Sequence, residues 1–349
     1  MFTVLSVAYP LAPVRPDASG GAEQVLGMLD EALVRAGHRS IVIAAEGSRV
    51  AGTLVAVPQP EGIFDKAALV RAEARHLEAV REAVRRHQPG LVHMHGQDFH
   101  AYMPPPGVPV LVTLHVPRQW YSPRAFGAAR AGVYFNCVSE TQRAQWEDRL
   151  PGVETIANGV PVALFNAGVP RRDFALALGR IAPEKGTHIA ATAAELAGIP
   201  LVIAGEVYRF PEHERYFREQ ILPRLSDTVR LAGPVGFQRK RRLMAAAGCV
   251  LLASQAPETS SLVAMEALAC GTPVIAYPAG ALAEIVEHER TGFLVRTPGE
   301  MAFAIRAAGR IDPEECRAAA RRRFSAAGMV ERYFALYRQL SQEWFRVAS

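Results

Sequence analysis

Two glutamates spaced eight positions apart form the strongest chemical signal in this sequence. Glu258 lies in a predicted loop after an apolar strand, and Glu266 falls in the second turn of the apolar helix that follows. A carboxylate on such a helix is costly to bury unless it is paired or hydrogen-bonded, and a ribose diol would be a suitable partner. The backbone amides of the loop before the helix would suit a phosphate group.

A basic loop opens the second half of the chain. Arg180 and Lys185 lie within residues 179–186, between a predicted strand and a predicted helix. Arginine is suited to bidentate contact with a phosphate and lysine supplies a compact point charge, so the pair could neutralise a pyrophosphate. Basic residues are also common in exposed loops, and this loop by itself is equally compatible with a solvated turn.

A glycine-rich turn occupies the corresponding place in the first half. The run Ser19-Gly20-Gly21-Ala22-Glu23 follows the first predicted strand and leads into a helix. Glycine lets the backbone approach a ligand closely, and the start of a helix offers free N–H groups to a phosphate. A flexible turn before a helix explains these residues equally well. The G-x-G-x-x-G fingerprint is absent, which disfavours a two-domain dehydrogenase.

Three histidines lie at or just after the ends of predicted strands in the first half. His93 and His95 alternate at the end of one strand, which places both side chains on one face of the sheet. They could form a metal pair, but ordinary polar residues at a strand end are the favoured interpretation. His115 follows the next strand, and its position alone favours neither a structural nor a functional role.

Short apolar strands alternate with amphipathic helices throughout, which predicts an α/β fold with parallel sheets covered on both faces. In the first half the predicted strands are 3–8, 41–45, 55–57, 91–94, 110–113 and 134–138, and the helices are 23–36 and 66–87. In the second half the predicted strands are 174–178, 201–204, 229–231, 249–253 and 273–276, and the helices are 186–197, 212–225, 240–247, 262–269 and 329–346.

Turn-forming residues within 158–172 mark a seam between the two arrays. We therefore predict a Rossmann-like domain over residues 1–165, a second over 166–328, and a C-terminal helix over 329–349. Open sheets of this kind bind ligands beyond the carboxyl ends of their strands, and a cleft between the two domains is the expected place for chemistry.

The composition suits two soluble domains, because 50% of the 349 residues are hydrophobic and 21% are charged. No apolar run is long enough to span a membrane, and the N-terminal run MFTVLSVAYP lacks the basic flank of a signal peptide. A cytoplasmic location is therefore expected. The 4 cysteines form no C-x-x-C pair, so we expect reduced, buried side chains.

The net charge of +5 arises in the second half, because residues 1–165 carry equal numbers of basic and acidic side chains. Part of the excess lies in the runs 239–242 and 321–323. We interpret both as solvated helix faces, with attraction of an anionic ligand as the alternative. Basic and aromatic residues are not interleaved, so no nucleic acid partner is expected. The balanced first half gives no support for a basic membrane-docking face.

Taken together, these motifs resemble those of the retaining glycosyltransferases of family 4 (glycosyl transferases group 1), which have the GT-B fold. Residues 257–276 resemble the family's E-x7-E segment, 179–186 its G-R-x-x-x-x-K-G element, and Gly20-Gly21-x-Glu23 its N-terminal glycine loop. Further matches follow the family's order along nearly the whole chain, at 92–96, 113–115, 138–140, 158–160, 202–205 and 291–295.

The resemblance implies two Rossmann-like domains facing a central cleft, with the acceptor beside the first, the donor on the second, and the final helix crossing back. Arg180 and Lys185 would hold the donor diphosphate, Glu266 the ribose hydroxyls and Glu258 hydroxyls of the donor sugar. His115 would line the cleft beside that sugar, completing the implied catalytic set of Arg180, Lys185, Glu258 and His115. The donor-binding set is completed, on this resemblance, by Gly20, Gly21, Gly205, Ser260, Ser261 and Leu262.

The implied reaction moves a hexose-type sugar, with retention and without a metal, from a UDP- or GDP-linked donor to a hydroxyl of a glycan, lipid or small metabolite. No cofactor is expected, because the nucleotide sugar is a co-substrate, and the protein is expected as a monomer or homodimer. The absence of a D-x-D motif argues against a metal-dependent GT-A enzyme. The alternatives are a GT-B epimerase or phosphorylase and a non-catalytic nucleotide-sugar binding module.

The sequence departs from the family at one place. The family often has an aromatic–glycine pair after the first glutamate, whereas Thr259-Ser260-Ser261 stands here. Ser261 keeps the backbone N–H but adds a hydroxyl. This departure leaves the identity of the donor sugar open.

Overall fold

A computed structural model describes residues 2–16, 18, 20–60, 62, 64–127, 130–165 and 168–348. The chain divides into two compact units, Met1–Ala157 with Gly328–Ser349, and Asn158–Ala327. Two sequence expectations, Ser19 of the glycine turn and the start of the second domain at 166, fall outside the described residues. The second unit begins earlier in the chain than 166, because Val160 pairs with the backbone of Phe324 and Ala326 in that unit.

The first unit contains a parallel sheet whose strands, among the described residues, run in the order β3-β2-β1-β4-β5-β6-β7. The strands are β1 (Thr3–Val7), β2 (Arg39–Ala45), β3 (Thr53–Val57), β4 (Leu91–Met94), β5 (Val110–Leu114), β6 (Val133–Cys137) and β7 (Glu154–Thr155). The helices are α1 (Gly21–Arg35), α2 (Lys66–His87), α3 (Glu140–Trp146) and α11 (Ala326–Ala348). Every strand predicted in this half is present, whereas β7 and α3 are too short for their periodicity to have predicted them.

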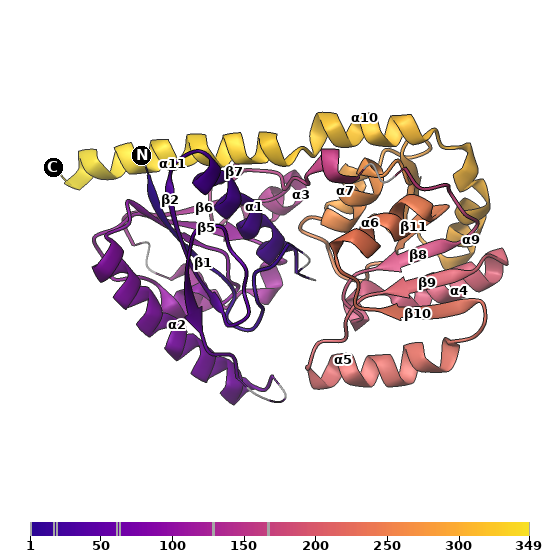
Figure 1. Ribbon diagram of the computed structural model, residues 1–349, viewed down its shortest axis with the longest axis horizontal. Helices are drawn as coiled ribbons and strands as arrows, with labels where there is room; N and C mark the ends of the chain where they lie inside the picture. Colours follow the sequence, from indigo (N-terminus) through magenta and orange to yellow (C-terminus); the bar gives the residue numbers. More distant parts are fainter. Residues whose placement is uncertain are drawn as a thin grey trace. The chain divides into compact units, whose positions relative to one another are not determined.

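Alternation along β2 explains why this sheet is covered on both faces (Figure 1). Ile41 and Ile43 point into one core, which also contains Val80 of α2. Val42 and Ala44 point the opposite way, into a smaller cluster with Leu26 of α1. A strand buried on both sides needs apolar residues at every position, which is the pattern that predicted it.

A polar layer lies on one face of the central strands, against α11. His93 of β4 bonds through Nδ1 to the Tyr337 hydroxyl at 2.7 Å and through Nε2 to the Thr113 hydroxyl at 2.7 Å. Thr113 donates to Asn136 Oδ1 at 2.7 Å, and Asn136 Nδ2 donates to the Tyr333 hydroxyl at 3.2 Å. All five side chains are buried, so α11 is held to the sheet by specific hydrogen bonds in addition to apolar packing.

A second buried histidine makes the stability of this unit sensitive to pH. His76 of α2 lies edge-on to Tyr102, with ring centroids 5.6 Å apart. Burial lowers its pKa from 6.5 to about 4, and a smaller effect of the Ala72 backbone opposes this shift. Between pH 6.5 and 4 the unfolded chain therefore binds more protons than the folded chain, and stability falls as the pH falls through that window.

We expect this titration to contribute about 3 kcal/mol at most to the loss of unfolding free energy at acid pH. The measurement is urea unfolding of the native chain and of His76→Leu at pH 7.5 and pH 4.5. The variant should lose less stability between these pH values than the native chain. A His288→Leu control, at an exposed position, should keep the native pH dependence. Equal pH dependence in His76→Leu and the native chain would contradict the assignment.

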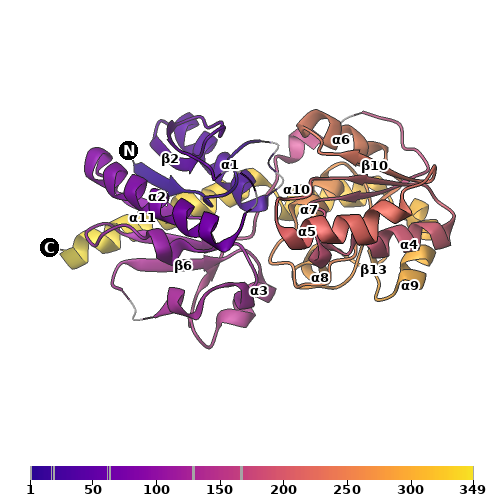
Figure 2. The same cartoon turned by 90° about the horizontal axis from the view of Figure 1, so that it is seen from below.

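The second unit contains a parallel sheet whose described strands run in the order β10-β9-β8-β11-β12-β13. The strands are β8 (Ala175–Leu178), β9 (Leu201–Ala204), β10 (Val229–Gly233), β11 (Cys249–Leu252), β12 (Val274–Ala276) and β13 (Gly292–Leu294). The helices are α4 (Thr187–Ala197), α5 (Pro211–Tyr216), α6 (Phe237–Ala246), α7 (Leu262–Ala269), α8 (Leu282–Ile285), α9 (Pro298–Ala307) and α10 (Pro313–Arg323). In a view turned by 90° about the horizontal axis, helices again lie on both faces of this sheet (Figure 2).

Small residues bring the helices of the second unit close to its sheet. Ala190 and Ala194 of α4 pack in one core with Leu201 and Ile203 of β9 and with Met301 of α9. The structure adds α8, α9, α10 and β13 to the elements predicted for this half. The predicted helix 212–225 is irregular in the structure, because α5 continues into a π-helical turn at Phe217–Ile221 and a 3-10 turn at Leu222–Arg224.

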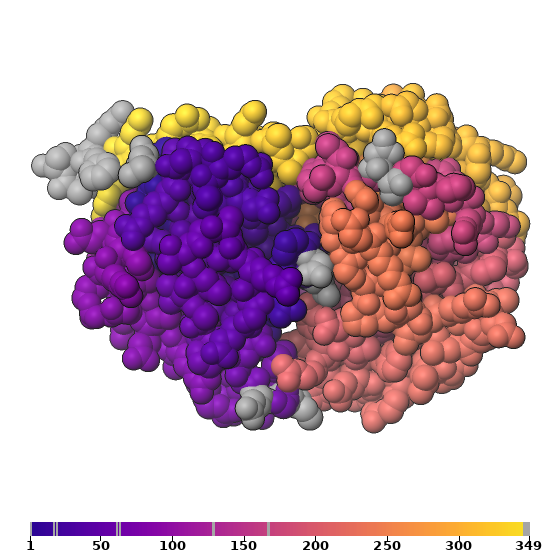
Figure 3. Space-filling model, in the orientation of Figure 1, coloured from indigo at the N-terminus to yellow at the C-terminus, as the bar shows by residue number. Residues whose placement is uncertain are grey.

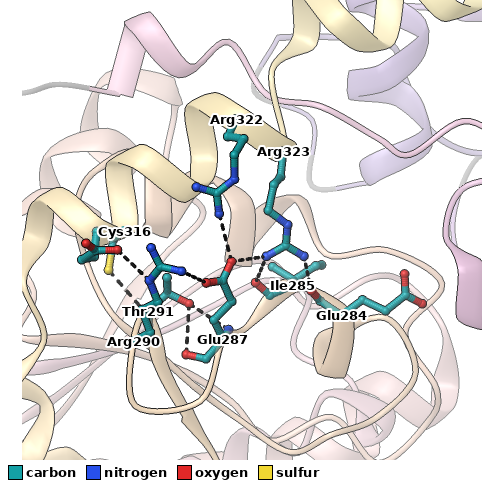
Figure 4. A network of polar contacts seen from close by, with 9 residues as sticks. Glu284, Ile285, Glu287, Arg290, Thr291, Cys316, Arg322 and Arg323 are labelled. Carbon is teal, nitrogen blue, oxygen red and sulfur yellow. Dashed lines mark hydrogen bonds and ion pairs between the residues drawn. The ribbon is translucent and has the colours of Figure 1, made fainter.

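A network of ion pairs fixes the end of α10 to the segment between α8 and β13 (Figure 4). Glu287 accepts from Arg323 at 2.8 Å, from Arg290 at 3.2 Å and from Arg322 at 3.4 Å. Arg321 and Arg322 are 55% exposed, and α10 lies at the surface of its unit (Figure 3). The solvated face predicted for 321–323 is therefore confirmed at Arg321 and Arg322, whereas the side chain of Arg323 is 28% exposed and also donates to the Ile285 carbonyl at 3.4 Å.

Two further expectations concern the cysteine side chains and the absence of a membrane-spanning helix. Cys137, Cys249, Cys270 and Cys316 are free and buried, which confirms the interpretation of the cysteines as small apolar residues. Within the described ranges, no helix is both long and apolar enough to cross a bilayer.

Candidate functional site

The predicted pyrophosphate loop and the first glutamate meet in the second unit. Lys185 Nζ lies 2.7 Å from Glu258 Oε1. Lys185 follows β8 and Glu258 follows β11, and these are the neighbouring strands between which the order of the sheet reverses. Ligands of open parallel sheets bind beyond the carboxyl ends of strands at such a reversal. The topology therefore joins two motifs that are distant in sequence at the place where a ligand is expected.

The carboxylate of Glu258 is held by its own loop as well as by the lysine. The Ser254 hydroxyl, which is buried, donates to Glu258 Oε1 at 2.5 Å. The Glu258 backbone pairs with the loop after β12, through the amide of Ala281 at 2.8 Å and the carbonyl of Ala279 at 3.2 Å. This arrangement fixes the carboxylate before any ligand binds, and a sugar hydroxyl would compete with Ser254 and Lys185 for its oxygen atoms.

Arg180 lies on the same loop as Lys185 but makes different contacts. Its Nη2 atom is 3.4 Å from Glu184 Oε1, and its guanidinium lies 5.4 Å from the centre of the Tyr208 ring. Both charged side chains are partly exposed, with 23% and 20% of their side-chain surface accessible. A long, partly solvated ion pair is weak, so the guanidinium is available to exchange Glu184 for a more highly charged anion.

Two glycines of the second unit occupy positions that permit close backbone contacts. A Cβ at Gly205, at the end of β9, would overlap the carbonyl oxygen of Gly179. A Cβ at Gly186 would overlap the carbonyl oxygen of Ala253, and Gly186 has φ +61° in the left-handed region. Because Gly186 has no side chain, the loop that carries Lys185 can pack directly against the backbone of Ala253, which precedes Ser254.

The start of α7 uses the serines that replace the family's aromatic–glycine pair. Ser261 is the N-cap of α7, and its hydroxyl accepts from the Ala264 amide at 3.4 Å. The Ser260 hydroxyl is buried and has no hydrogen-bond partner among the described residues. Leu262 is buried at the first helical position. The hydroxyl of Ser261 is thus occupied by the helix end, whereas that of Ser260 is left for another partner.

The second glutamate is paired with a residue that was not singled out as a site residue. Glu266 of α7 is 2% exposed, and its Oε1 atom lies 2.5 Å from Nζ of Lys240, which is 6% exposed. Burial raises the pKa of the Glu266 carboxyl above its ordinary value, and the ammonium of Lys240 opposes that rise. The solvated face predicted for residues 239–242 is therefore wrong at Lys240, because this position faces the interior of the unit.

In the first unit, the glycine turn begins α1 as predicted. Gly20 is the N-cap and Gly21 the first residue of the helix. A Cβ at Gly20 would overlap the carboxylate of Glu23, whose side chain is buried and folds back over the turn. A side chain at Gly20 would displace this carboxylate from the positive end of the helix dipole.

The predicted cleft histidine is paired with another histidine. His95 Nδ1 lies 3.0 Å from His115 Nε2, and burial lowers the pKa of His115 to about 3. Burial, with smaller effects of the neighbouring rings, also lowers the pKa of His95. Both imidazoles are therefore neutral near pH 7, and one must donate to the other. Among the residues that the structure describes, no group of three or more His, Cys, Asp or Glu is arranged to hold a metal ion.

The structure thus joins Lys185 with Glu258 in a direct contact, whereas Arg180 and Glu266 each pair with a different residue. Sequence reasoning missed Ser254 and Lys240. Lys240 carried a usable signal, because it lies three residues after Phe237 and four before Met244, on the apolar side of α6. Ser254 carried none, because a serine after a strand is common in loops.

Comparison with known families gives two matches that lie side by side in the sequence. Residues 172–310 match the family described as glycosyl transferases group 1. Residues 19–164 match the family described as glycosyltransferase family 4. The first match contains the Arg180, Lys185 and Glu258 loops, and the second contains the glycine turn and His115.

Curated relatives are similar over part of their length. A D-inositol 3-phosphate glycosyltransferase of Mycobacteroides abscessus is 32% identical over 159 residues, which cover 42% of this chain and 36% of the relative. A lipopolysaccharide 1,2-N-acetylglucosaminetransferase of Salmonella typhimurium is 25% identical over 217 residues, covering 60% of this chain and 54% of the relative. The chain therefore spans about half or less of the length of these relatives.

Solved structures are similar over nearly the whole chain. AviGT4, a glycosyltransferase involved in avilamycin A biosynthesis, superimposes with a TM-score of 0.74 at 29% identity, covering 98% of each chain. Anabaena HepE, solved with UDP and glucose, has a TM-score of 0.73 at 20% identity and covers 97% of this chain and 100% of its own. The second likeness, at this identity, concerns the fold alone.

Proposed function

Because this chain belongs to the glycosyltransferases of group 1 and family 4 and has the GT-B fold, we propose that it moves a hexose-type sugar from a nucleoside diphosphate to an acceptor hydroxyl. The observation that carries the proposal is the contact of Lys185 with Glu258 at the strand-order reversal between β8 and β11. A cation for a diphosphate and an anion for sugar hydroxyls stand side by side there.

The electrostatics of the loop support a leaving diphosphate. Arg180 and Lys185 both follow β8, and each is paired in this structure with a partly exposed carboxylate. A diphosphate carries more charge than a carboxylate and can accept from several donors, so it would displace these partners. Fixed cations near the leaving group would stabilise the charge that develops as the glycosidic bond breaks.

The finer features are part of the same proposal. We expect a UDP- or GDP-linked donor, retention of anomeric configuration, and turnover without a bound metal. Retention would follow a front-face route in which the departing phosphate accepts the proton of the acceptor hydroxyl. On this route Glu258 binds sugar hydroxyls and does not act as one of a pair of acid and base carboxylates. The anomeric configuration of the product by NMR, and turnover in excess EDTA, test the last two features.

The proposal is tested first by ligand-induced stabilisation. We expect one of UDP, GDP, ADP and TDP, at about 100 times its dissociation constant, to raise the unfolding midpoint by about 5 °C or more. The sugar conjugates of that nucleotide are then assayed for transfer and hydrolysis. No stabilisation by any of the four would contradict the donor site. Isomerisation of the donor sugar without an acceptor would instead favour an epimerase.

A further inference from the structure

The basic run on α6 contains one lysine that differs from its neighbours. Lys240 is 6% exposed, whereas Arg239 and Arg242 are exposed. An α-helix places residues three and four apart on one face, so Lys240 shares its face with Phe237 and Met244. A buried lysine is unusual unless it is paired, and its position on an apolar face requires a specific partner.

The ammonium of Lys240 is fixed from three sides. Glu266 Oε1 lies 2.5 Å from its Nζ atom. The same atom lies 5.8 Å from the centre of the Phe237 ring and 5.9 Å from that of Phe165. Aromatic faces attract a cation at these distances, and together with the carboxylate they leave the ammonium little freedom to move.

The carboxylate of Glu266 is satisfied on one side only. Its Oε1 atom accepts from Lys240, whereas Oε2 is buried and has no hydrogen-bond partner among the described residues. A buried acceptor without a hydrogen-bond donor costs free energy. A hydroxyl group of a ligand that donated to this atom would remove that cost. The unsatisfied atom belongs to α7, which begins four residues after Glu258 in the chain.

We propose that Lys240 is a positioning residue for nucleotide recognition. It holds Glu266 ionised and immobile through Oε1, so that Oε2 is presented as a charged acceptor to the ribose hydroxyls of the donor. An ionised acceptor makes a stronger hydrogen bond than a neutral one, and a protonated carboxyl could rotate and present its O–H instead. The inference rests on the proposed function, because it assumes a ribonucleotide donor.

The test compares a ribonucleotide with the same nucleotide lacking its ribose hydroxyls. Dissociation constants are measured for UDP and 2′,3′-dideoxy-UDP, or for the GDP pair if GDP is the stabilising nucleotide. In Lys240→Met, a change that keeps side-chain length, the affinity for UDP should fall about tenfold or more. Affinity for the dideoxy analogue should stay unchanged, which a general structural defect would not produce. Arg239→Ala, on the exposed side of α6, should leave both affinities unchanged.

Removal of one member of a buried ion pair can unfold a protein, so a second variant is included. In Lys240→Met/Glu266→Gln no unpaired charge remains, and its affinities should match those of Glu266→Gln alone. This equality shows that Lys240 acts through Glu266. The inference would be overturned if Lys240→Met kept the native preference for UDP over the dideoxy analogue. It would also be overturned if the losses of UDP affinity in the two single variants added up in the double variant. Failure of the proposed function is distinct, because the native protein would then bind neither nucleotide.

Discussion

Arg180→Ala is expected to lower kcat/KM for the donor by about 10- to 100-fold, or about 1.5–3 kcal/mol, because a charge-assisted contact with the diphosphate is lost. The loss should appear in kcat as well as in KM, since charge on the leaving diphosphate increases in the transition state. The ion pair with Glu184 is 3.4 Å long and partly exposed. Its removal should therefore leave the unfolding midpoint nearly unchanged.

Two control variants separate this effect from a general loss of charge. Arg230→Ala removes an exposed arginine from β10 of the same sheet and should retain native turnover. Glu184→Gln removes the carboxylate that pairs with Arg180 in this structure. This variant should not show the loss of turnover expected for Arg180→Ala. Steady-state kinetics with the donor identified by stabilisation provide the measurement. Native turnover in Arg180→Ala would count strongly against the assigned role.

Gly186→Ala is expected to destabilise the second unit by about 2–5 kcal/mol, for two physical reasons that can be separated. Gly186 has φ +61°, a left-handed conformation that costs an alanine about 1–2 kcal/mol. An added Cβ would also overlap the carbonyl oxygen of Ala253, and overpacking of this kind adds about 1–3 kcal/mol.

Gly198, at the other end of α4, provides the matched control. It has φ +71°, but a Cβ added there would meet nothing within 4 Å. Gly198→Ala should therefore show the conformational cost alone, and the difference between the two variants in chemical unfolding measures the contact. Equal destabilisation would mean that the backbone at Ala253 moves aside without cost. We also expect Gly186→Ala to weaken donor binding, because the displaced strand end carries Ser254, which donates to Glu258.

Periodicity determined most of the elements that carry the site. The bounds of α2, β4, β9 and α7 agree with those predicted, because long helices and continuous apolar runs leave few alternatives. Short elements such as β7 and α8 could not be predicted, since they contain too few residues for a repeat. The order of the strands in each sheet could not be predicted either, because strand pairing depends on contacts between segments distant in the chain.

The sequence alone also determined which residue types could hold a nucleotide sugar: Arg180 and Lys185 as cations, Glu258 and Glu266 as acceptors of hydroxyl groups. It determined their local positions too, since each follows or lies within an element whose bounds periodicity predicts. Chemical type and short-range position are properties of neighbouring residues. For this reason they can be inferred before the chain is folded.

Only the tertiary structure decided which of these residues are partners. Lys185 contacts Glu258 because β8 and β11 are adjacent at the reversal of strand order, although 73 residues separate them in sequence. Glu266 pairs with Lys240 because α6 turns its apolar face toward α7 and carries the lysine inward with it. Pairing between distant segments depends on packing and burial of the whole unit. A single stretch can indicate that Lys240 is buried, but it does not identify Glu266 as the partner.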